Sequence, residues 1–321
     1  MMNKDHFVAK IFIIFFLTFC IISLQLFYDT FPLVNDINTT IIAEIRLPRA
    51  ILGLLAGGGL ALCGTVLQGV FRNNLVEPYT LGISGGSAVG VALGLMVNFQ
   101  TFLGFSSLII AGFLGALFSL FILYIVAIRN HKIDTKNLLL IGVMISFISS
   151  SLLMLILSIS KVENLHGIVF WIMGSLGNAE NNINFILFFI VSSGFVIFYL
   201  LANDLNAMQF GYEKSFTLGV NIDVVIKITI ITASFITASI VSVTGMVGFI
   251  GLVVPHLMRK LFYKDFRILL PTSFLGGGFF LTASDFLASK IIYPNELPVG
   301  VITGIVGGIF FIYIFKKERI R

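Results

Sequence analysis

Two arginines, Arg46 and Arg49, stand three positions apart across a Leu-Pro pair at the start of a long, glycine-rich apolar segment. On a helix this spacing puts both guanidinium groups on one face. A third basic residue, Lys290, comes shortly before the last apolar segment. Guanidinium groups can hold carboxylates in a bidentate geometry, whereas long basic side chains also snorkel to lipid headgroups as simple anchors. The residues alone leave both interpretations open.

Two further polar features lie within apolar sequence. The Pro255-His256 pair could indicate a metal ligand or a proton relay, but His256 has no His, Cys or carboxylate partner at ligand spacing. We therefore interpret this pair as a structural or gating helix end. Asp285 lies in an apolar segment near its expected outer end, where it could reach water or Lys290.

Composition determines the class of protein. The chain has 321 residues, of which 58% are hydrophobic and 11% are charged, and its mean hydropathy is +1.05. A soluble domain of this size needs about 25% charged residues, so we predict an integral membrane protein. Apolar runs of helix-spanning length predict an all-α bundle of about ten crossings and a single domain over 1–321. The expected spans are 7–27, 48–71, 79–98, 103–127, 137–159, 183–202, 224–243, 246–263, 269–288 and 297–315.

The distribution of charge predicts the topology. The first span is too long for a signal peptide and lacks a small-residue cleavage site, so we expect it to be retained, with the N-terminus in the cytoplasm. Ten crossings then place the C-terminus in the cytoplasm and leave only Arg46, Arg49, Lys161 and Lys290 outside among 20 basic residues. The net charge of +5 is mostly this orientation signal, and no nucleic-acid-binding domain is expected.

Two segments depart from the spanning pattern. Residues 203–223 carry charges and two glycines, and they are longer than a plain connection between helices needs. We predict short helices across the cytoplasmic surface there, although a solvated loop is the simpler alternative. Residues 166–177 are apolar but too short to span, which favours a surface or re-entrant helix on the outer side. Within them Trp171 is either an interfacial anchor or a cargo contact.

Small residues are frequent in this chain. Its 31 glycines cluster at helix-facing spacings, which is typical of tightly packed helices in lipid and, alternatively, of residues that line a pathway or allow helices to rock. The two cysteines, Cys20 and Cys63, lie in apolar runs and are expected to be buried hydrophobes. No cofactor or metal is expected.

Four segments together resemble the FecCD/BtuC-like permease family, the membrane subunits of ABC importers for iron–siderophore complexes, haem and vitamin B12. The resemblance covers most of the chain. Its motifs are RLPR at 46–49 with FRNNLVEP and LGISGG downstream, EKSFTLG at 213–219, GMVGFIGLVVPHLMRKLFYKDFRILLP at 245–271 and ELPVGVITGIVGG at 296–308. It implies a bundle like that of BtuC, paired with a second permease chain that is either identical or paralogous.

The resemblance also implies roles for particular residues. Arg46, Arg49 and Lys290 would grip acidic residues of an extracytoplasmic substrate-binding protein, although arginine is usual at the third position and lysine loses its bidentate geometry. The residues that would contact the ATPase are Tyr212, Glu213, Phe216, Leu218 and Gly219, with Gly219 at the turn between two short helices. The expected pathway or gate residues are Gly82, Ser84, Gly85, Gly86, Trp171, Gly174, Pro255 and His256.

The residues distinguish three functional classes. An intramembrane enzyme would need paired carboxylates or a nucleophile with its base, and the sequence shows neither arrangement. An ion-coupled secondary transporter usually keeps ionisable groups near the membrane midplane, and the sequence gives only weak evidence for such groups there. The chain has no G-x-x-x-x-G-K-[ST] phosphate loop, so the expected energy source is a separate cytoplasmic ABC ATPase dimer. We expect a non-enzymatic permease in the bacterial inner membrane, surrounded by lipid, with ferric siderophore as cargo and haem or vitamin B12 as alternatives.

Overall fold

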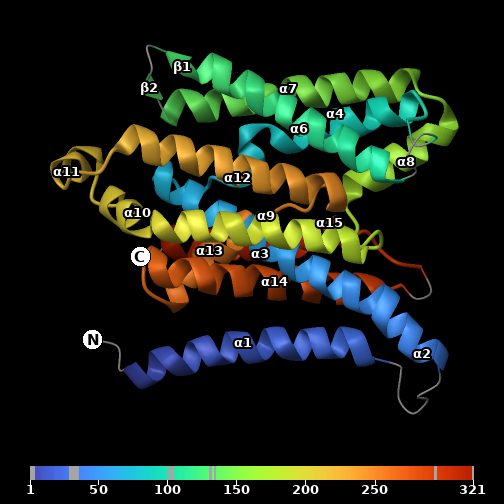
Figure 1. The fold of residues 1–321 in the computed structure, drawn as a ribbon, viewed down its shortest axis with the longest axis horizontal. Helices are drawn as coiled ribbons and strands as arrows, with labels where there is room; N and C mark the ends of the chain where they lie inside the picture. Colours follow the sequence, from blue (N-terminus) through green and yellow to red (C-terminus); the bar gives the residue numbers. More distant parts are fainter. Residues whose placement is uncertain are drawn as a thin grey trace.

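The computed structural model describes residues 4–28, 36–99, 101, 105–129, 132–133, 135–292 and 295–319. Nearly all of them are helical (Figure 1). The helical elements before the single hairpin are α1 (Lys4–Phe27), α2 (Asp36–Ile41), the π-helix η1 (Ile42–Arg46), α3 (Leu47–Val70), η2 (Pro78–Leu81), α4 (Ile83–Met96) and α6 (Phe105–Ala127). The hairpin consists of the two-residue strands β1 (Ile128–Arg129) and β2 (Lys132–Ile133), which pair antiparallel. The helices after it are α7 (Thr135–Ile159), α8 (Val162–Met173), α9 (Asn181–Leu200), α10 (Ala202–Met208), α11 (Tyr212–Thr217), α12 (Ile222–Thr244), α13 (Ile250–Leu261), α14 (Phe266–Lys290) and α15 (Val299–Arg319).

The all-α bundle predicted from composition is confirmed, and each of the ten expected spans coincides with a helix. Seven helices in the described part of the chain are long and apolar enough to cross a membrane. The other three, α4, α13 and α15, have shorter apolar stretches. The span expected at 246–263 is the most reduced, because an extended segment with two left-handed residues, Gly245 and Phe249, precedes the 12-residue helix α13.

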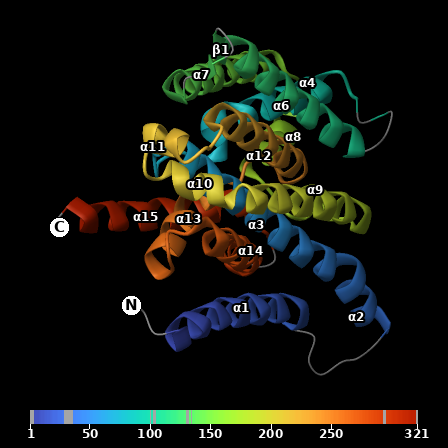
Figure 2. The ribbon, with the colours of Figure 1, turned by 60° about the vertical axis from the view of Figure 1, so that its left-hand side comes forward.

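The long helices run roughly side by side, so the bundle has two ends (Figures 1 and 2). One end carries α10, α11, the β1–β2 hairpin and the start of α1, and we call it the α11 end. Lys10 near the start of α1 donates to the Leu261 carbonyl at the end of α13, 3.0 Å away, which places that end of α13 there too. The opposite end carries α2, α8 and the start of α3, and we call it the Arg46 end.

Helix α3 forms the centre of the bundle. In the 18-residue apolar stretch that marks this region as a candidate span 89% of the residues are buried, whereas in the corresponding stretch of α1 at the periphery only 6% are buried. Helix α3 packs against α9, α12, α13 and α14, and its side chains form much of the hydrophobic core. A helix that is apolar on every face fits this position, since it has no polar side that must reach water.

Glycines allow the backbones around α3 to meet directly. A Cβ on Gly57 would overlap the Gly277 carbonyl of α14, and a Cβ on Gly277 would overlap the Gly57 carbonyl. A Cβ on Gly64 would likewise overlap the Gly251 carbonyl at the start of α13. Small residues at helix crossings are the expected route to close packing in a membrane, because lipid provides no hydrophobic force between helices.

The short helices α10 and α11 are tied to the bundle by polar contacts. Asn206 of α10 donates to the Asp265 carboxylate over 2.7 Å and accepts from the Phe266 backbone N–H over 2.9 Å. Tyr212 of α11 donates to the Val70 carbonyl at the end of α3, with an O···O distance of 2.7 Å. The α10–α11 segment is therefore joined to the start of α14 and to the end of α3.

The contact between Gly64 and Gly251 predicts a position that tolerates no side chain. Gly64→Ala should reduce stability by about 1–3 kcal/mol, because the added methyl meets backbone that cannot move aside. Thermal unfolding of the purified protein in detergent measures this effect. The matched control is Gly304→Ala in α15, where an added Cβ has no neighbour within 4 Å. Equal melting temperatures for the two variants would contradict the proposed close packing.

Candidate functional site

The three basic residues that the sequence grouped together lie around one pocket at the Arg46 end. Its volume is about 200 Å³. Its walls come from the end of α1, the α2–η1 segment, the start of α3, the end of α14 and the residue Glu296. The lining residues are Gln25, Tyr28, Ile41, Ile45, Arg46, Arg49, Phe286, Ser289, Lys290 and Glu296. The pocket combines an apolar wall with a group of charges.

Arg49 is held inside this pocket by two carboxylates. Its Nε and Nη2 donate to the two oxygens of Asp285 at 2.8 and 2.9 Å, and its Nη1 donates to Glu296 at 2.8 Å. Asp285 is 1% exposed and also accepts from the Gln25 amide at 2.8 Å, whereas the Glu296 side chain is 52% exposed. Bidentate pairing with Asp285 fixes the guanidinium plane, and Glu296 covers its outer edge.

This arrangement corrects the expectation for Asp285. The residue reaches neither water nor Lys290, because the guanidinium of Arg49 fills the space on the pocket side of its carboxylate. The Nζ of Lys290 lies instead over the ring of Tyr28, 4.2 Å from its centroid. Gln25, Asp285 and Glu296 were not predicted from the sequence as partners of Arg49. The feature of the sequence that could have revealed two of them is that Asp285 and Glu296 lie in segments expected at the same outer surface as Arg49.

Arg46 is placed differently from Arg49. Its Nη1 donates to the Leu26 and Tyr28 carbonyls at 2.9 and 2.7 Å, where the backbone leaves α1. In the described part of the chain no ion pair is found for Arg46, since both salt bridges there belong to Arg49. Together with Lys290, Arg46 adds basic charge to the lining of the pocket.

The predicted coupling segment projects from the α11 end. Phe216 and Leu218 are 74% and 66% exposed, and the neighbouring Phe210 is 69% exposed. Glu213 is also exposed, whereas Tyr212 is partly buried because its hydroxyl binds the end of α3. Exposed apolar side chains on a polar surface segment are typical of a protein-binding surface. Tyr212 is better described as the anchor of this surface than as part of its exposed face.

The position expected for Gly219 is wrong. The turn between the two short helices contains Gly211, whose φ is +107°, while Gly219, with φ +86°, follows α11 and begins the connection to α12. Both glycines have a positive φ, a backbone conformation that residues with a side chain rarely adopt. The sequence showed two suitable glycines, and only the helix boundaries decide which of them separates α10 from α11.

The glycines expected at a pathway or gate are helix-packing positions within this chain. Gly82 and Gly85 face α7, where an added Cβ would lie 2.7 Å from side chains of Ile145 and Ser149 respectively. A Cβ on Gly86 would overlap Ser119 of α6. Ser84 is buried as well. Their role in a pathway therefore stays a prediction.

Trp171 and Gly174 lie at the end of α8. Trp171 lines a cavity of about 300 Å³ between α4, α6, α8 and α12, together with polar residues such as Asn178 and Thr244. Gly174, with φ +73°, faces the Met246 carbonyl in the segment before α13. These contacts place α8 against the connection between α12 and α13.

Pro255 is buried inside α13, and His256 follows it on a partly buried face. In the described residues no group of three or more His, Cys, Asp or Glu side chains could hold a metal ion. Near the end of the same helix, Arg259 donates to Gln68 of α3, and Gln68 donates to the Gly251 carbonyl over 3.0 Å. The polar contacts of α13 thus join it to α3.

Glu77, a residue of the polar turn FRNNLVEP, lies where the α3–η2 connection meets the start of α13. Burial raises the pKa of its carboxyl above the ordinary value, and a hydrogen bond from the Phe249 backbone N–H opposes this shift. The adjacent Tyr79 hydroxyl accepts from the Val247 backbone N–H and donates to the Val247 carbonyl, with both distances 2.9 Å. The turn is therefore attached to the segment between α12 and α13.

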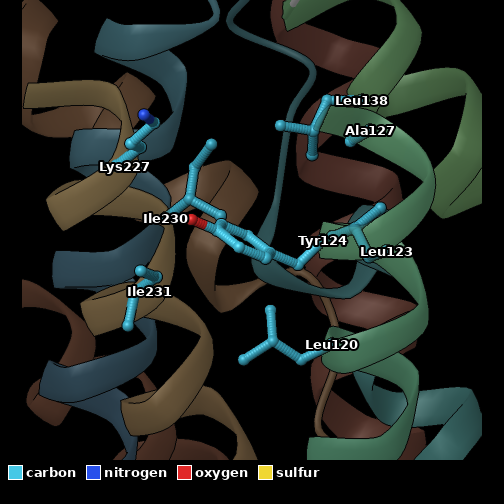
Figure 3. Close-up of a pocket in the computed structure, with 8 residues that line it drawn as sticks. All are labelled: Leu120, Leu123, Tyr124, Ala127, Leu138, Lys227, Ile230 and Ile231. Carbon is cyan, nitrogen blue, oxygen red and sulfur yellow. The ribbon is translucent and has the colours of Figure 1, made fainter. Parts of the chain in front are cut away.

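A further cavity in the described structure lies between α6, α7 and α12, and Figure 3 shows its lining. The ring of Tyr124 extends from α6 toward Ile230 on α12 (Figure 3). The remaining volume is about 10 Å³, which is no more than a single water needs. This cavity cannot hold a cargo molecule.

The fold and the two ends define a multi-pass helical membrane protein with a basic pocket at one end and an exposed apolar segment at the other. Residues 7–317 match the FecCD transport family, and the chain belongs to that family. It is 35% identical over 289 residues to the cobalamin import system permease protein BtuC of Halobacterium salinarum, covering 90% of this chain and 76% of the relative. It is also 37% identical over 280 residues to a Helicobacter pylori protein named 'Probable iron chelatin transport system permease protein'. That match covers 87% of this chain and 83% of the relative.

A solved structure has the same architecture along its whole length. It is described as an inward-facing conformation of a metal-chelate type ABC transporter, and it matches with a TM-score of 0.86 and 28% identity. The match covers 96% of this chain and 99% of that chain. The predicted resemblance to BtuC-like permeases is therefore confirmed for family and fold.

The geometry around Arg49 predicts unequal roles for its two carboxylates in stability. Asp285→Asn should destabilise the protein by about 3–5 kcal/mol, because it leaves a largely buried guanidinium without its bidentate partner. Glu296→Gln should cost less than about 1 kcal/mol, because that pair is exposed on one side. Thermal unfolding in detergent compares the two variants directly. A larger loss for Glu296→Gln would mean that the buried pair has been misassigned.

Proposed function

We propose that this permease forms one half of a translocation pathway with a second permease chain, with its α11 end in the cytoplasm. A separate ABC ATPase dimer would bind the α10–α11 segment, and an extracytoplasmic substrate-binding protein would bind the Arg46 end. The observation that supports this arrangement is the location of the two candidate surfaces at opposite ends of the bundle. The α11 end gathers most of the basic residues, which favours a cytoplasmic location.

The coupling surface has a simple mechanical basis. Phe216 and Leu218 are exposed, while Tyr212 attaches α11 to the end of α3 and Asn206 attaches α10 to the start of α14. A partner that moves the exposed side chains would therefore move the ends of two long membrane helices. ATP-driven closure of an ATPase pair could in this way change which end of the pathway is open, as alternating access requires.

The docking surface is the basic pocket at the Arg46 end. Arg46 and Lys290 provide positive charge around a volume of about 200 Å³, with Tyr28 and Ile45 as apolar neighbours. An acidic side chain of a binding protein suits this combination, because it would be drawn in by charge and covered by the apolar wall. Arg49 contributes behind them, already paired with Asp285.

For the cargo we propose a ferric siderophore. Support comes from the relative named for iron chelatin transport, from the solved structure named for metal chelates, and from the prevalence of siderophore importers in the resembled family. Haem or vitamin B12 is the alternative, since a similar permease is named for cobalamin import. Selection would reside chiefly in the binding protein.

The coupling proposal predicts the effect of making α11 polar. Phe216→Ser with Leu218→Ser should reduce co-purification of the ATPase by about ten-fold or more, because truncating two central apolar contacts commonly costs over 1 kcal/mol each. Val162→Ser on α8 is the matched control, since Val162 is 81% exposed at the opposite end. Retention of the ATPase by the double variant would place the coupling surface elsewhere.

The function as a whole is tested by ATPase activity in proteoliposomes that contain this chain and its ATPase. Binding protein loaded with ferric siderophore should stimulate ATP hydrolysis, and Arg46→Glu with Lys290→Glu should abolish that stimulation by repelling an acidic partner. Lys161→Glu is the control, because Lys161 is an exposed basic residue at the start of α8, outside the pocket. Stimulation by haem- or cobalamin-loaded binding protein alone would correct the cargo, while the absence of any ATPase association would reject the permease mechanism.

A further inference from the structure

We propose that Glu296 is an internal placeholder for the acidic group of the docking protein, and that docking exchanges this carboxylate on Arg49. The inference rests on the proposed binding of a substrate-binding protein at the Arg46 end. It adds a consequence of docking: release of residues 295–298, which lead directly into α15.

The two carboxylates on Arg49 differ in the way that such an exchange requires. Asp285 is 1% exposed, is held by both Nε and Nη2 of Arg49, and lies within a long helix. Glu296 contacts only Nη1, is 52% exposed, and lies outside helical structure. A carboxylate that enters the pocket can therefore replace Glu296 while Asp285 keeps the guanidinium in place.

The charges of the pocket favour the exchange. Arg46, Arg49 and Lys290 all line it, and Glu296 is the acidic residue among its lining residues. The pair with Glu296 contributes little net stability, because the half-exposed Glu296 carboxylate is solvated when it separates and Arg49 keeps its pairing with Asp285. A partner carboxylate that also interacts with Arg46, whose hydrogen-bond partners are the Leu26 and Tyr28 carbonyls, gains an attraction that Glu296 alone does not supply.

The release of Glu296 would be transmitted through the first turn of α15. The loop is secured to α14 by the Leu297 N–H, which donates to the Ala288 carbonyl over 3.1 Å. Three residues after Pro298, Val301 donates back to the Pro298 carbonyl over 3.1 Å. Gly300 lies so close to the Met173 and Met246 carbonyls that a Cβ would overlap Met173. The start of α15 therefore contacts both the end of α8 and the segment before α13.

Hydrogen–deuterium exchange in lipid nanodiscs tests the release directly, using the permease with its ATPase. In the absence of binding protein, Glu296→Gln should raise the exchange rate of the Leu297 and Val301 amides several-fold. Glu296→Asp should do the same, because it keeps the charge but shortens the side chain. Glu44→Gln is the control, since Glu44 is an exposed acid on η1 at the same end and makes no ion pair with Arg49. It should leave these amides unchanged.

The candidate substrate-binding protein then serves as the probe. Its docking to the wild type should raise exchange at Leu297 and Val301 to the level of Glu296→Gln, and Glu296→Gln should bind it about three- to five-fold more tightly. Docking that leaves the amides protected, or equal tightening by Glu44→Gln and Glu296→Gln, would overturn the exchange while the proposed function stands. Failure of the wild type to bind the protein at all would reject the proposed function, and the exchange with it.

Discussion

The direct contact between the backbones of α3 and α14 is the constraint on which the other features depend. Gly57 and Gly277 face each other so closely that neither position has room for a Cβ. In lipid, helices associate through van der Waals contact and polar interactions, and this contact is possible only where side chains are absent. Because α3 is also the buried centre of the bundle, the pair it forms with α14 fixes the positions of the helices around it.

Both ends of this helix pair carry the contacts to which we assign function. At the α11 end, Tyr212 binds the last turn of α3 and Asn206 binds the start of α14. At the Arg46 end, Arg49 near the start of α3 binds Asp285 near the end of α14. A pair of close-packed helices slides or tilts as a unit more readily than it separates, because separation would open voids along the contact. The pair is thus a physical connection between the two surfaces.

The fold was predictable from the sequence because its signal is distributed over hundreds of residues. Helix-length apolar runs predicted a helix at each of the ten expected positions, of which seven are long enough to span a membrane, and the glycine clusters predicted close packing without identifying which glycines meet. The basic pocket was predicted in part, since Arg46, Arg49 and Lys290 were grouped through the resemblance. The partners of Arg49 were missed because Gln25, Asp285 and Glu296 lie far from it in the chain, and only the packing of α1, α3 and α14 brings them together. Likewise, the place of Gly219 depended on where α11 ends.

The buried pair of Arg49 and Asp285 needs an explanation other than stability. Replacing a buried ion pair with apolar residues of similar volume is often neutral or stabilising, because desolvation offsets most of the attraction. What apolar residues cannot do is fix the orientation of a guanidinium. With Nε and Nη2 bound to Asp285, the remaining edge of Arg49 has one orientation, toward the pocket where Glu296 meets it. We therefore interpret Asp285 as the positioning residue that keeps one hydrogen-bonding edge of Arg49 directed toward an acidic group, whether that group belongs to this chain or to a partner.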